Sequence, residues 1–89
     1  MPKKMYPFKI GKKYLIRTVT YFSLGQLERI DGDFLVLSQA SWVADTGRFT
    51  QALKDGTLNE VEITGEVYVN VNSIVDAFPW EHELPTKQK

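Results

Sequence analysis

The sequence GQLERIDGDFLVL, residues 25–37, decides the fold. Within it, Gln26–Ile30 mixes apolar and charged positions and Phe34–Leu37 is a continuous apolar run, so both parts are typical of β-strands. Asp31-Gly32-Asp33 lies between them, and Asp-Gly favours tight hairpins because it tolerates the positive φ that such turns require. Residues 25–37 therefore predict a β-hairpin, and its second strand can extend to Trp42.

Further strands are predicted on both sides of this hairpin. Tyr14–Phe22 is dense in β-branched and aromatic residues, which suit a pleated surface. Val61–Thr64 is a short alternating run, and Val67–Val71 alternates strictly, with three valines on one face. Asn72-Ser73 connects this strand to a last apolar strand, Ile74–Phe78. Five main strands within about 65 residues, joined by short turns, predict a single small all-β barrel.

The period of the apolar residues changes between Asp45 and Gly56. Asp45 or Thr46 can cap the N-terminus of a helix, and Gly56 suits the position just past its end. The pattern predicts a short amphipathic helix of about three turns, or a helical loop, inside an insertion of residues 45–66. The apolar residues of this helix fall at i, i+3 and i+4, namely Phe49, Ala52 and Leu53.

The chain divides into three parts. Residues 1–13 are expected to form an extended basic arm, because Pro2 and Pro7 disfavour a helix there. Residues 14–80 are expected to form the barrel, and residues 81–89 a flexible tail. The first 17 residues carry six positive charges and no negative one, although the formal net charge of the whole chain is zero. This asymmetry is typical of a surface for nucleic acid or another acidic partner, or of an arm that lies against acidic residues of its own or a neighbouring subunit.

The composition excludes several classes of function. The chain has no cysteine, so it holds no disulfide, thiolate metal site or cysteine nucleophile. Its single histidine, His82, lacks partners at useful spacing, and no phosphate-binding loop, nucleophile elbow or metal-ligand spacing occurs. We therefore predict a protein that is not an enzyme and binds no metal or cofactor. Without a signal peptide or an apolar run of about 20 residues, it is expected to be soluble and cytoplasmic, with no membrane as a partner.

These motifs resemble those of the Sm-like (LSm) family. The first family motif, Gly-x-apolar-x-x-apolar-Asp followed by a turn and an apolar strand, is matched by Gly25–Asp31 and Phe34–Leu37. The second, a strand, a tight turn and a closing strand, is matched in position by Val67–Val75. The likeness spans roughly Tyr14–Phe78 and implies a small Sm-like (SH3-like) five-stranded barrel with the helix inserted. The run Pro7–Arg48 further resembles Sm-like proteins of phage origin.

The sequence departs from the family at the positions where family members bind RNA. Members that hold uridine-rich RNA in the central pore use an Asn after the Asp turn and the Arg of an Arg-Gly turn. Here Phe34 or Leu35 stands in place of that Asn, and Asn70-Val71 stands in place of Arg-Gly. The usual residues for base recognition are therefore missing, and RNA binding becomes the second interpretation.

The resemblance also implies a mechanism of assembly. In the family, the last strand of one subunit pairs with the preceding strand of its neighbour until a ring closes. The residues alone favour the same outcome, since Ile74–Phe78 carries one charge and is poorly protected as a free edge. Head-to-tail pairing of such edges closes into a ring if the rotation allows. The predicted subunit interface consists of Val67, Val69, Val71, Ile74, Val75, Ala77 and Phe78.

Two functional classes follow. The first is a homo-oligomeric ring that serves as a structural or protein-interaction scaffold. The second is a ring that binds RNA or single-stranded nucleic acid weakly and mainly by charge, with Lys12, Lys13 and Arg17 at phosphates and Asn70 and Asn72 at bases. Five aromatic residues could stack on bases, although packing in the core or the interface is their commoner role in so small a domain: Tyr21, Phe22, Trp42, Tyr68 and Trp80.

Overall fold

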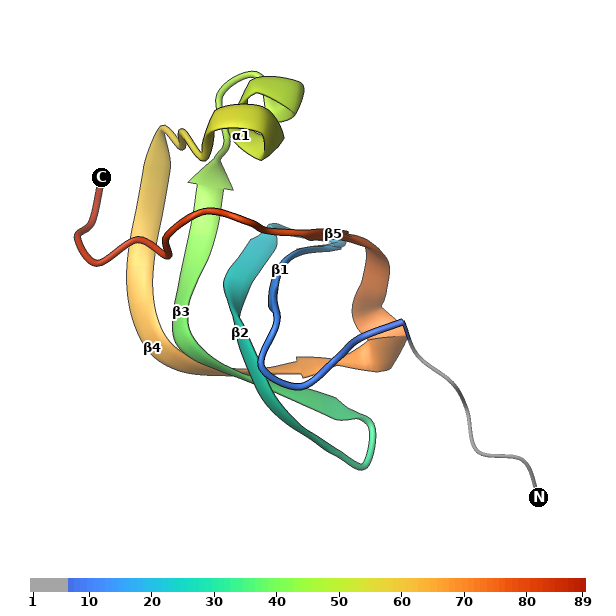
Figure 1. Ribbon diagram of the computed structural model, residues 1–89. Coiled ribbons are helices and arrows are strands. Elements are labelled where there is room, and N and C mark those ends of the chain that lie inside the picture. Colours follow the sequence, from blue (N-terminus) through green and yellow to red (C-terminus); the bar gives the residue numbers. More distant parts are fainter. Residues whose placement is uncertain (1–6) are drawn as a thin grey trace.

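The computed structural model describes residues 7–89 and shows one antiparallel sheet of five strands (Figure 1). The order of the strands is β4-β3-β2-β1-β5, so β4 and β5 are the two edges of the sheet. The predicted all-β fold of five strands with one inserted helix is confirmed. Its elements are β1 Lys13–Thr18, β2 Phe22–Asp31, β3 Phe34–Asp45, α1 Phe49–Asp55, β4 Glu60–Asn70, the 3₁₀ turn η1 Val71–Ser73 and β5 Ile74–Pro79.

The sheet curls around an inner core to which every strand contributes. Alternate residues of β1 point to opposite faces of the sheet, so Tyr14 and Ile16 enter this core whereas Leu15 points the other way. Ala77 of β5 packs against the same core. The inner core holds the barrel together, and its buried residues are Tyr14, Ile16, Leu27, Leu35, Leu37, Ala40 and Val69.

A second core lies on the opposite face of the sheet, beneath α1 and the C-terminal segment. The chain after β5 runs back across β3 and β4, as Figure 1 shows, and it covers this face together with α1. Because both faces of β1 are covered, this central strand is almost fully enclosed over Tyr14–Ile16. The buried residues of the second core are Leu15, Leu24, Val43, Ala52, Leu58, Val61 and Trp80.

Bulges bend the three long strands. The register between paired strands shifts at Gly25 in β2, near Gln39 in β3 and at Gly65 in β4. Gln39 and Gly65 have positive φ angles of 50° and 84°. An extra residue at a bulge bends its strand, so the two halves of each long strand pack on different cores. In β4, the N-terminal half reaches the second core through Val61, and the C-terminal half reaches the inner core through Val69.

Two strand boundaries predicted from the sequence are wrong. The predicted strand Tyr14–Phe22 is two strands joined by a turn, in which the amide and the hydroxyl of Thr18 both donate to the Tyr21 carbonyl, at 3.0 and 2.9 Å. This turn contains no Gly or Pro, so the sequence carries no signal that would predict it. The two runs on either side of Gly65, predicted as separate, belong to one continuous strand, because this glycine forms a bulge rather than a break. The predicted insertion 45–66 therefore contains the first part of β4.

Helix α1 has seven residues and is shorter than predicted. Asp45 and Thr46 do not cap it: the Asp45 carboxylate accepts from the Gly47 amide at 2.8 Å, and the Thr46 hydroxyl donates to the Gly47 carbonyl at 2.9 Å. Both side chains instead stabilise the turn before the helix. The predicted end is confirmed, since Gly56 is left-handed, with φ 77°, and its amide donates to the Ala52 carbonyl at 2.8 Å. No helix within residues 7–89 is long and apolar enough to span a membrane.

The first described residues lie against the barrel. The predicted arm comprises residues 1–13, and its first six residues lie outside the described residues. The Phe8 ring packs edge-on against the ring of Tyr14, with centroids 5.0 Å apart. The Gly11 amide donates to the Leu27 carbonyl at 2.7 Å. The described part of the arm is therefore anchored to the start of β1 and to β2.

The C-terminal strap, which we define as Trp80–Lys89, also lies against the barrel. Trp80 is only 2% exposed, and Leu84 packs against the second core. Lys89 and Val61 exchange two backbone hydrogen bonds of 3.0 and 3.2 Å. The strap therefore ends on the outer edge of β4. The flexibility predicted for residues 81–89 stays a prediction.

Candidate functional site

The outer edge of β5 exposes the backbone groups of Ala77. In an antiparallel pair of strands, residues bonded to the partner alternate with residues whose backbone groups point away. The Trp80 amide donates to the Lys13 carbonyl at 2.9 Å, and from this pair the alternation turns Phe78 and Asp76 towards β1. Ala77 therefore directs its amide and its carbonyl to the free side of β5.

The outer edge of β4 exposes the backbone groups of Tyr68 and Asn70. The Val71 amide donates to the Asp33 carbonyl at 2.8 Å, beside the ladder between β3 and β4. Alternation from this bond turns Val69 towards β3 and leaves Tyr68 and Asn70 directed outwards. The Asn70 carbonyl already accepts the Ser73 hydroxyl at 2.7 Å, so Tyr68 is the residue with both backbone groups free. Both edges of the sheet thus present backbone groups that are not bonded within the sheet, which is a template for pairing with another strand.

A hollow of about 330 Å³ lies beside this part of β4. Its walls are Val67–Asn70 on one side and the turn Thr18–Tyr21 with Trp42 on the other. Trp42 is 44% exposed, and its ring lies 4.8 Å from that of Tyr21. Val19, at the tip of the turn, is 84% exposed. The hollow therefore combines an open strand edge with exposed apolar side chains, as a docking site for an extended segment requires.

The side chains predicted to form the subunit interface face inwards with one exception. Val75 is 57% exposed and lies in a bulge, where the register between β1 and β5 shifts after Arg17. The groups of β4 and β5 that face outwards are therefore mainly backbone groups. The other six predicted side chains pack inside their own subunit: Val67, Val69, Val71, Ile74 and Ala77 against the inner core, and Phe78 against the ring of Phe49.

Two of the predicted nucleic-acid residues, Lys12 and Lys13, line a hollow of about 570 Å³ together with Lys9. We call it the lysine hollow. It lies where β1 begins and β5 ends, and Glu81 is on its wall. Lys13 Nζ donates to the His82 carbonyl at 2.5 Å, whereas Lys9 and Lys12 are exposed. The lysine hollow therefore offers two ammonium groups, at one end of β1, that form no hydrogen bond or ion pair within residues 7–89.

The other predicted nucleic-acid residues lie at the opposite end of β1. Arg17 forms a two-point ion pair with Asp76, with contacts of 2.5 and 2.9 Å, and the hydrogen bond and charge of Asp76 raise the pKa of Arg17. Asn70 accepts the Asn72 amide through Oδ1 at 2.8 Å and so stabilises η1. The structure does not bring the five predicted residues together, because the lysines and the asparagines lie beyond opposite ends of β1.

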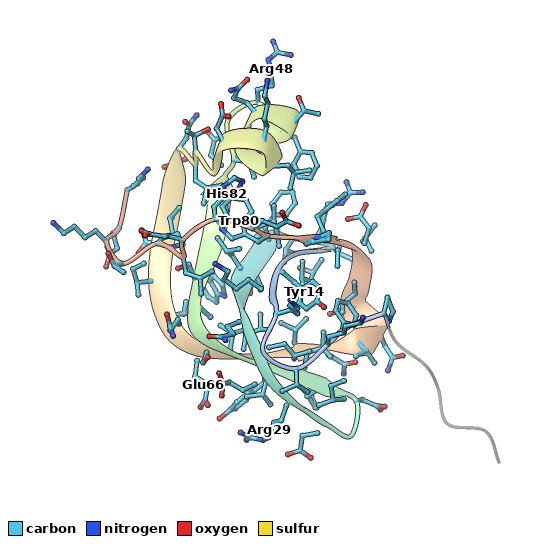
Figure 2. All side chains as sticks on the ribbon, in the orientation of Figure 1. Tyr14, Arg29, Arg48, Glu66, Trp80 and His82 are labelled. Carbon is cyan, nitrogen blue, oxygen red and sulfur yellow. The ribbon has the colours of Figure 1, made fainter. Side chains whose placement is uncertain are left out.

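A small polar group surrounds Tyr68 on the outside of the barrel; Figure 2 labels two of its members, Arg29 and Glu66, on the same side of the molecule. The Tyr68 hydroxyl donates to the Glu66 carboxylate at 2.8 Å, and this bond and the negative charge raise the pKa of Tyr68, while Arg29 lowers it. Tyr68 is 60% exposed, so packing in the core explains Trp80 but not Tyr68 or Trp42. Within residues 7–89, no group of three His, Cys, Asp or Glu side chains is placed to hold a metal ion.

Sequence reasoning missed the position of His82. Its Nε2 lies 2.8 Å from the Leu53 carbonyl, and its ring packs edge-on against Trp80 at 5.1 Å, beneath α1 in Figure 2. Gly56 provides the space, because a Cβ there would lie 2.7 Å from His82 Cγ. The polar strap has no periodic pattern, so the one usable signal was Trp80, a large apolar side chain that is highly buried on average.

The fold is similar to that of a heptameric archaeal Sm protein of known crystal structure. The two structures superpose with a TM-score of 0.53 and are 22% identical in sequence, and the match covers 79% of this chain and 87% of that chain. No family model matches the sequence, and neither does any curated protein. The chain therefore has the Sm fold, as the resemblance of its motifs implied.

Proposed function

We propose that this chain assembles into a homomeric ring that acts as a structural or protein-interaction scaffold and has no catalytic activity. The observation that carries the proposal is the pair of open edges, β4 and β5, at opposite sides of one small sheet. Different edges that pair head to tail form a heterologous contact, which makes a ring when the rotation closes. The similar archaeal Sm protein is heptameric, which supports a closed ring over an open filament.

In the proposed ring, Ile74–Phe78 of one copy pairs with Val67–Val71 of the next. The two strands run antiparallel, as all strand pairs within the barrel do, and antiparallel ladders are slightly more stable per residue. The outward amide and carbonyl of Tyr68 then exchange hydrogen bonds with those of Ala77. The hollow beside β4 receives the incoming strand, and Trp42 on its far wall loses its exposure to water.

Multi-angle light scattering of the full chain over a range of concentrations tests the proposal, together with the variant Ala77→Pro. Proline removes the outward amide of residue 77 but no hydrogen bond to β1, so the barrel is expected to fold and the ring to dissociate into monomers. Lys54→Ala, on the exposed side of α1, is the control and leaves assembly unchanged. A wild-type monomer at high concentration, or a full-sized ring of Ala77→Pro, contradicts the proposal.

The second candidate is a ring that binds RNA or single-stranded nucleic acid, and the lysine hollow favours it. Because the Asn and Arg of the family motifs are missing, affinity would be weak and electrostatic, with a salt slope of about −0.7 per phosphate contacted. The substitutions Lys12→Ala, Lys13→Ala and Arg17→Ala together should abolish it, as measured by fluorescence anisotropy at two salt concentrations. Sequence-selective binding that survives them contradicts this candidate.

A cytoplasmic location and a kinship with phage Sm-like proteins stay expectations from the sequence.

A further inference from the structure

The two strand edges that the proposed ring brings together carry opposite charges. Strand β4 contains three glutamates and no basic residue. All three glutamates, Glu60, Glu62 and Glu66, are exposed. Within residues 7–89, none of them forms an ion pair, since Arg17 with Asp76 is the one ion pair found there. The β4 edge therefore presents negative charge that no ion pair within the described residues neutralises, although Arg29 also acts on the hydroxyl of Tyr68 beside Glu66.

The end of β5 presents the complementary charge. The lysine hollow adjoins Pro79, the last residue of β5, and it contains three lysines against one glutamate, Glu81. Lys9 and Lys12 are exposed and form no ion pair in the described chain. The described part of the sheet therefore has a basic end beside β5, formed by Lys9 and Lys12, and an acidic edge along β4.

Antiparallel pairing of β4 with β5 sets these two surfaces against each other. If Tyr68 lies opposite Ala77 of the next copy, Glu66 lies opposite Pro79, because antiparallel partners run in opposite directions. The lysine hollow beyond Pro79 then lies alongside Glu62–Glu66. In a parallel arrangement, the same hollow would lie beyond Asn70, away from all three glutamates. Charge therefore distinguishes the two directions of pairing.

From these positions we infer that Glu62 and Glu66 form ion pairs with Lys9 and Lys12 of the next copy, and that these pairs fix the direction and register of strand pairing. The inference rests on the proposed ring and names the contacts that close it. Such charges at an interface favour the correct partner and speed its approach more than they add affinity. They are also weakened by salt, because the groups are exposed.

The C-terminal strap limits how far this contact extends. Lys89 already bonds both backbone groups of Val61, so an incoming strand can occupy the β4 edge no further than Glu62. The open length, Glu62–Asn70, accommodates β5 and the lysine hollow behind it. Glu60 lies beyond the limit, so it is expected to contribute little to the interface and serves as an internal comparison.

Charge reversal tests the inference in the full chain. The double variants Glu62→Lys, Glu66→Lys and Lys9→Glu, Lys12→Glu should each raise the dissociation constant of the ring about tenfold or more, because like charges then meet. The quadruple variant should restore assembly. An equimolar mixture of the two double variants should assemble more strongly than either variant alone, because each interface between unlike copies joins matching charges. A ring with an odd number of subunits would keep one interface between like copies. Analytical ultracentrifugation at low and high salt measures all four samples.

Two reversals on α1, Lys54→Glu and Asp55→Lys, control for a general effect of charge. If either double variant loses its fold, the quadruple variant still decides the question. Reversals that leave the ring intact while Ala77→Pro dissociates it would overturn the inference and leave the proposed ring standing. A lysine variant that keeps the ring but loses RNA affinity would overturn it too, since the lysines would then serve nucleic acid. A monomeric wild type overturns both.

Discussion

The two halves of β4 have opposite surroundings. The N-terminal half packs on the second core through Val61, and Lys89 bonds the edge at this same residue. The C-terminal half packs on the inner core, and its edge over Val67–Asn70 faces a hollow lined with exposed apolar side chains. A free edge invites pairing with any extended chain. The C-terminal strap thus covers the edge of the N-terminal half of β4, and the edge of the C-terminal half stays open to a partner strand.

The largest loss of stability is expected from a substitution of Trp80, which packs in the second core against the covered half of β4. Its indole is buried in the second core, so Trp80→Ala should lower the free energy of unfolding by about 3–5 kcal/mol. Trp42→Ala is the matched variant at the hollow beside the open half: it should cost about 1 kcal/mol, through the contact of Trp42 with Tyr21, but should weaken assembly. Urea unfolding and light scattering measure the two properties. Similar stability losses in both variants would contradict the division of β4 into two halves.

The bends that divide the long strands are tested next, at Gly25 in β2 and at Gly65 in β4. A Cβ at Gly25 would lie 3.0 Å from Leu37 Cβ and 3.1 Å from Ala40 Cβ, so Gly25→Val should overpack the bend and cost about 1–3 kcal/mol. At Gly65 a Cβ would meet nothing within 4 Å, and only the positive φ of 84° opposes a side chain there. Gly65→Ala should therefore cost about 1–2 kcal/mol. Thermal unfolding ranks them, and a negligible effect at Gly25 would refute the close approach.

A smaller effect is expected from uncovering the protected edge. Lys89→Pro removes the amide that donates to the Val61 carbonyl, which should cost about 0.5–1.5 kcal/mol. It should also speed hydrogen exchange of the Val61 amide and raise the tendency to aggregate. Lys89→Ala loses only the contact of Nζ with the Leu58 carbonyl and keeps both backbone bonds. If the two variants exchange at the same rate, the strap does not protect the edge.

The smallest effect concerns Tyr68, on the open half. Its raised pKa means that the bond to Glu66 stabilises the fold fully below the ordinary tyrosine pKa of about 10 and is lost as pH rises through the folded-state pKa. Tyr68→Phe should therefore lower stability slightly at neutral pH and converge with the wild type in strong alkali. Ultraviolet difference titration of the two proteins measures the phenol directly. An ordinary or lowered pKa would show that Glu66 is turned away, towards a partner.

The sequence predicted those parts of the fold that depend on local patterns. Period-two alternation and the Asp31–Asp33 turn were sufficient for the central hairpin, and Gly56 marked the end of α1. The turn after Thr18 was missed because hydrogen bonds close it without Gly or Pro. The contact of Lys89 with Val61 joins residues 28 positions apart and has no local signal. Long-range contacts between polar segments lie outside what periodicity can show.

The candidate site could be predicted only in part, for a related reason. The strands of the proposed interface were identified, but side-chain pattern cannot tell which backbone groups point outwards. That choice depends on a single bond, from the Trp80 amide to the Lys13 carbonyl, which sets the alternation along β5 as far as the bulge at Val75. Likewise, three lysines near the N-terminus become one hollow only because Pro79 and Trp80 return to the start of β1.

Gly56 and His82 fit together so closely that substitutions at the two positions should be coupled. The imidazole fills the space that a Cβ at position 56 would need, so either residue limits what the other can become. In a mutational scan, a side chain at 56 should be tolerated chiefly alongside a small residue at 82, whereas a change at 82 alone should be milder. A substitution of His82 by a smaller residue would therefore have to come before a substitution of Gly56 at the end of α1.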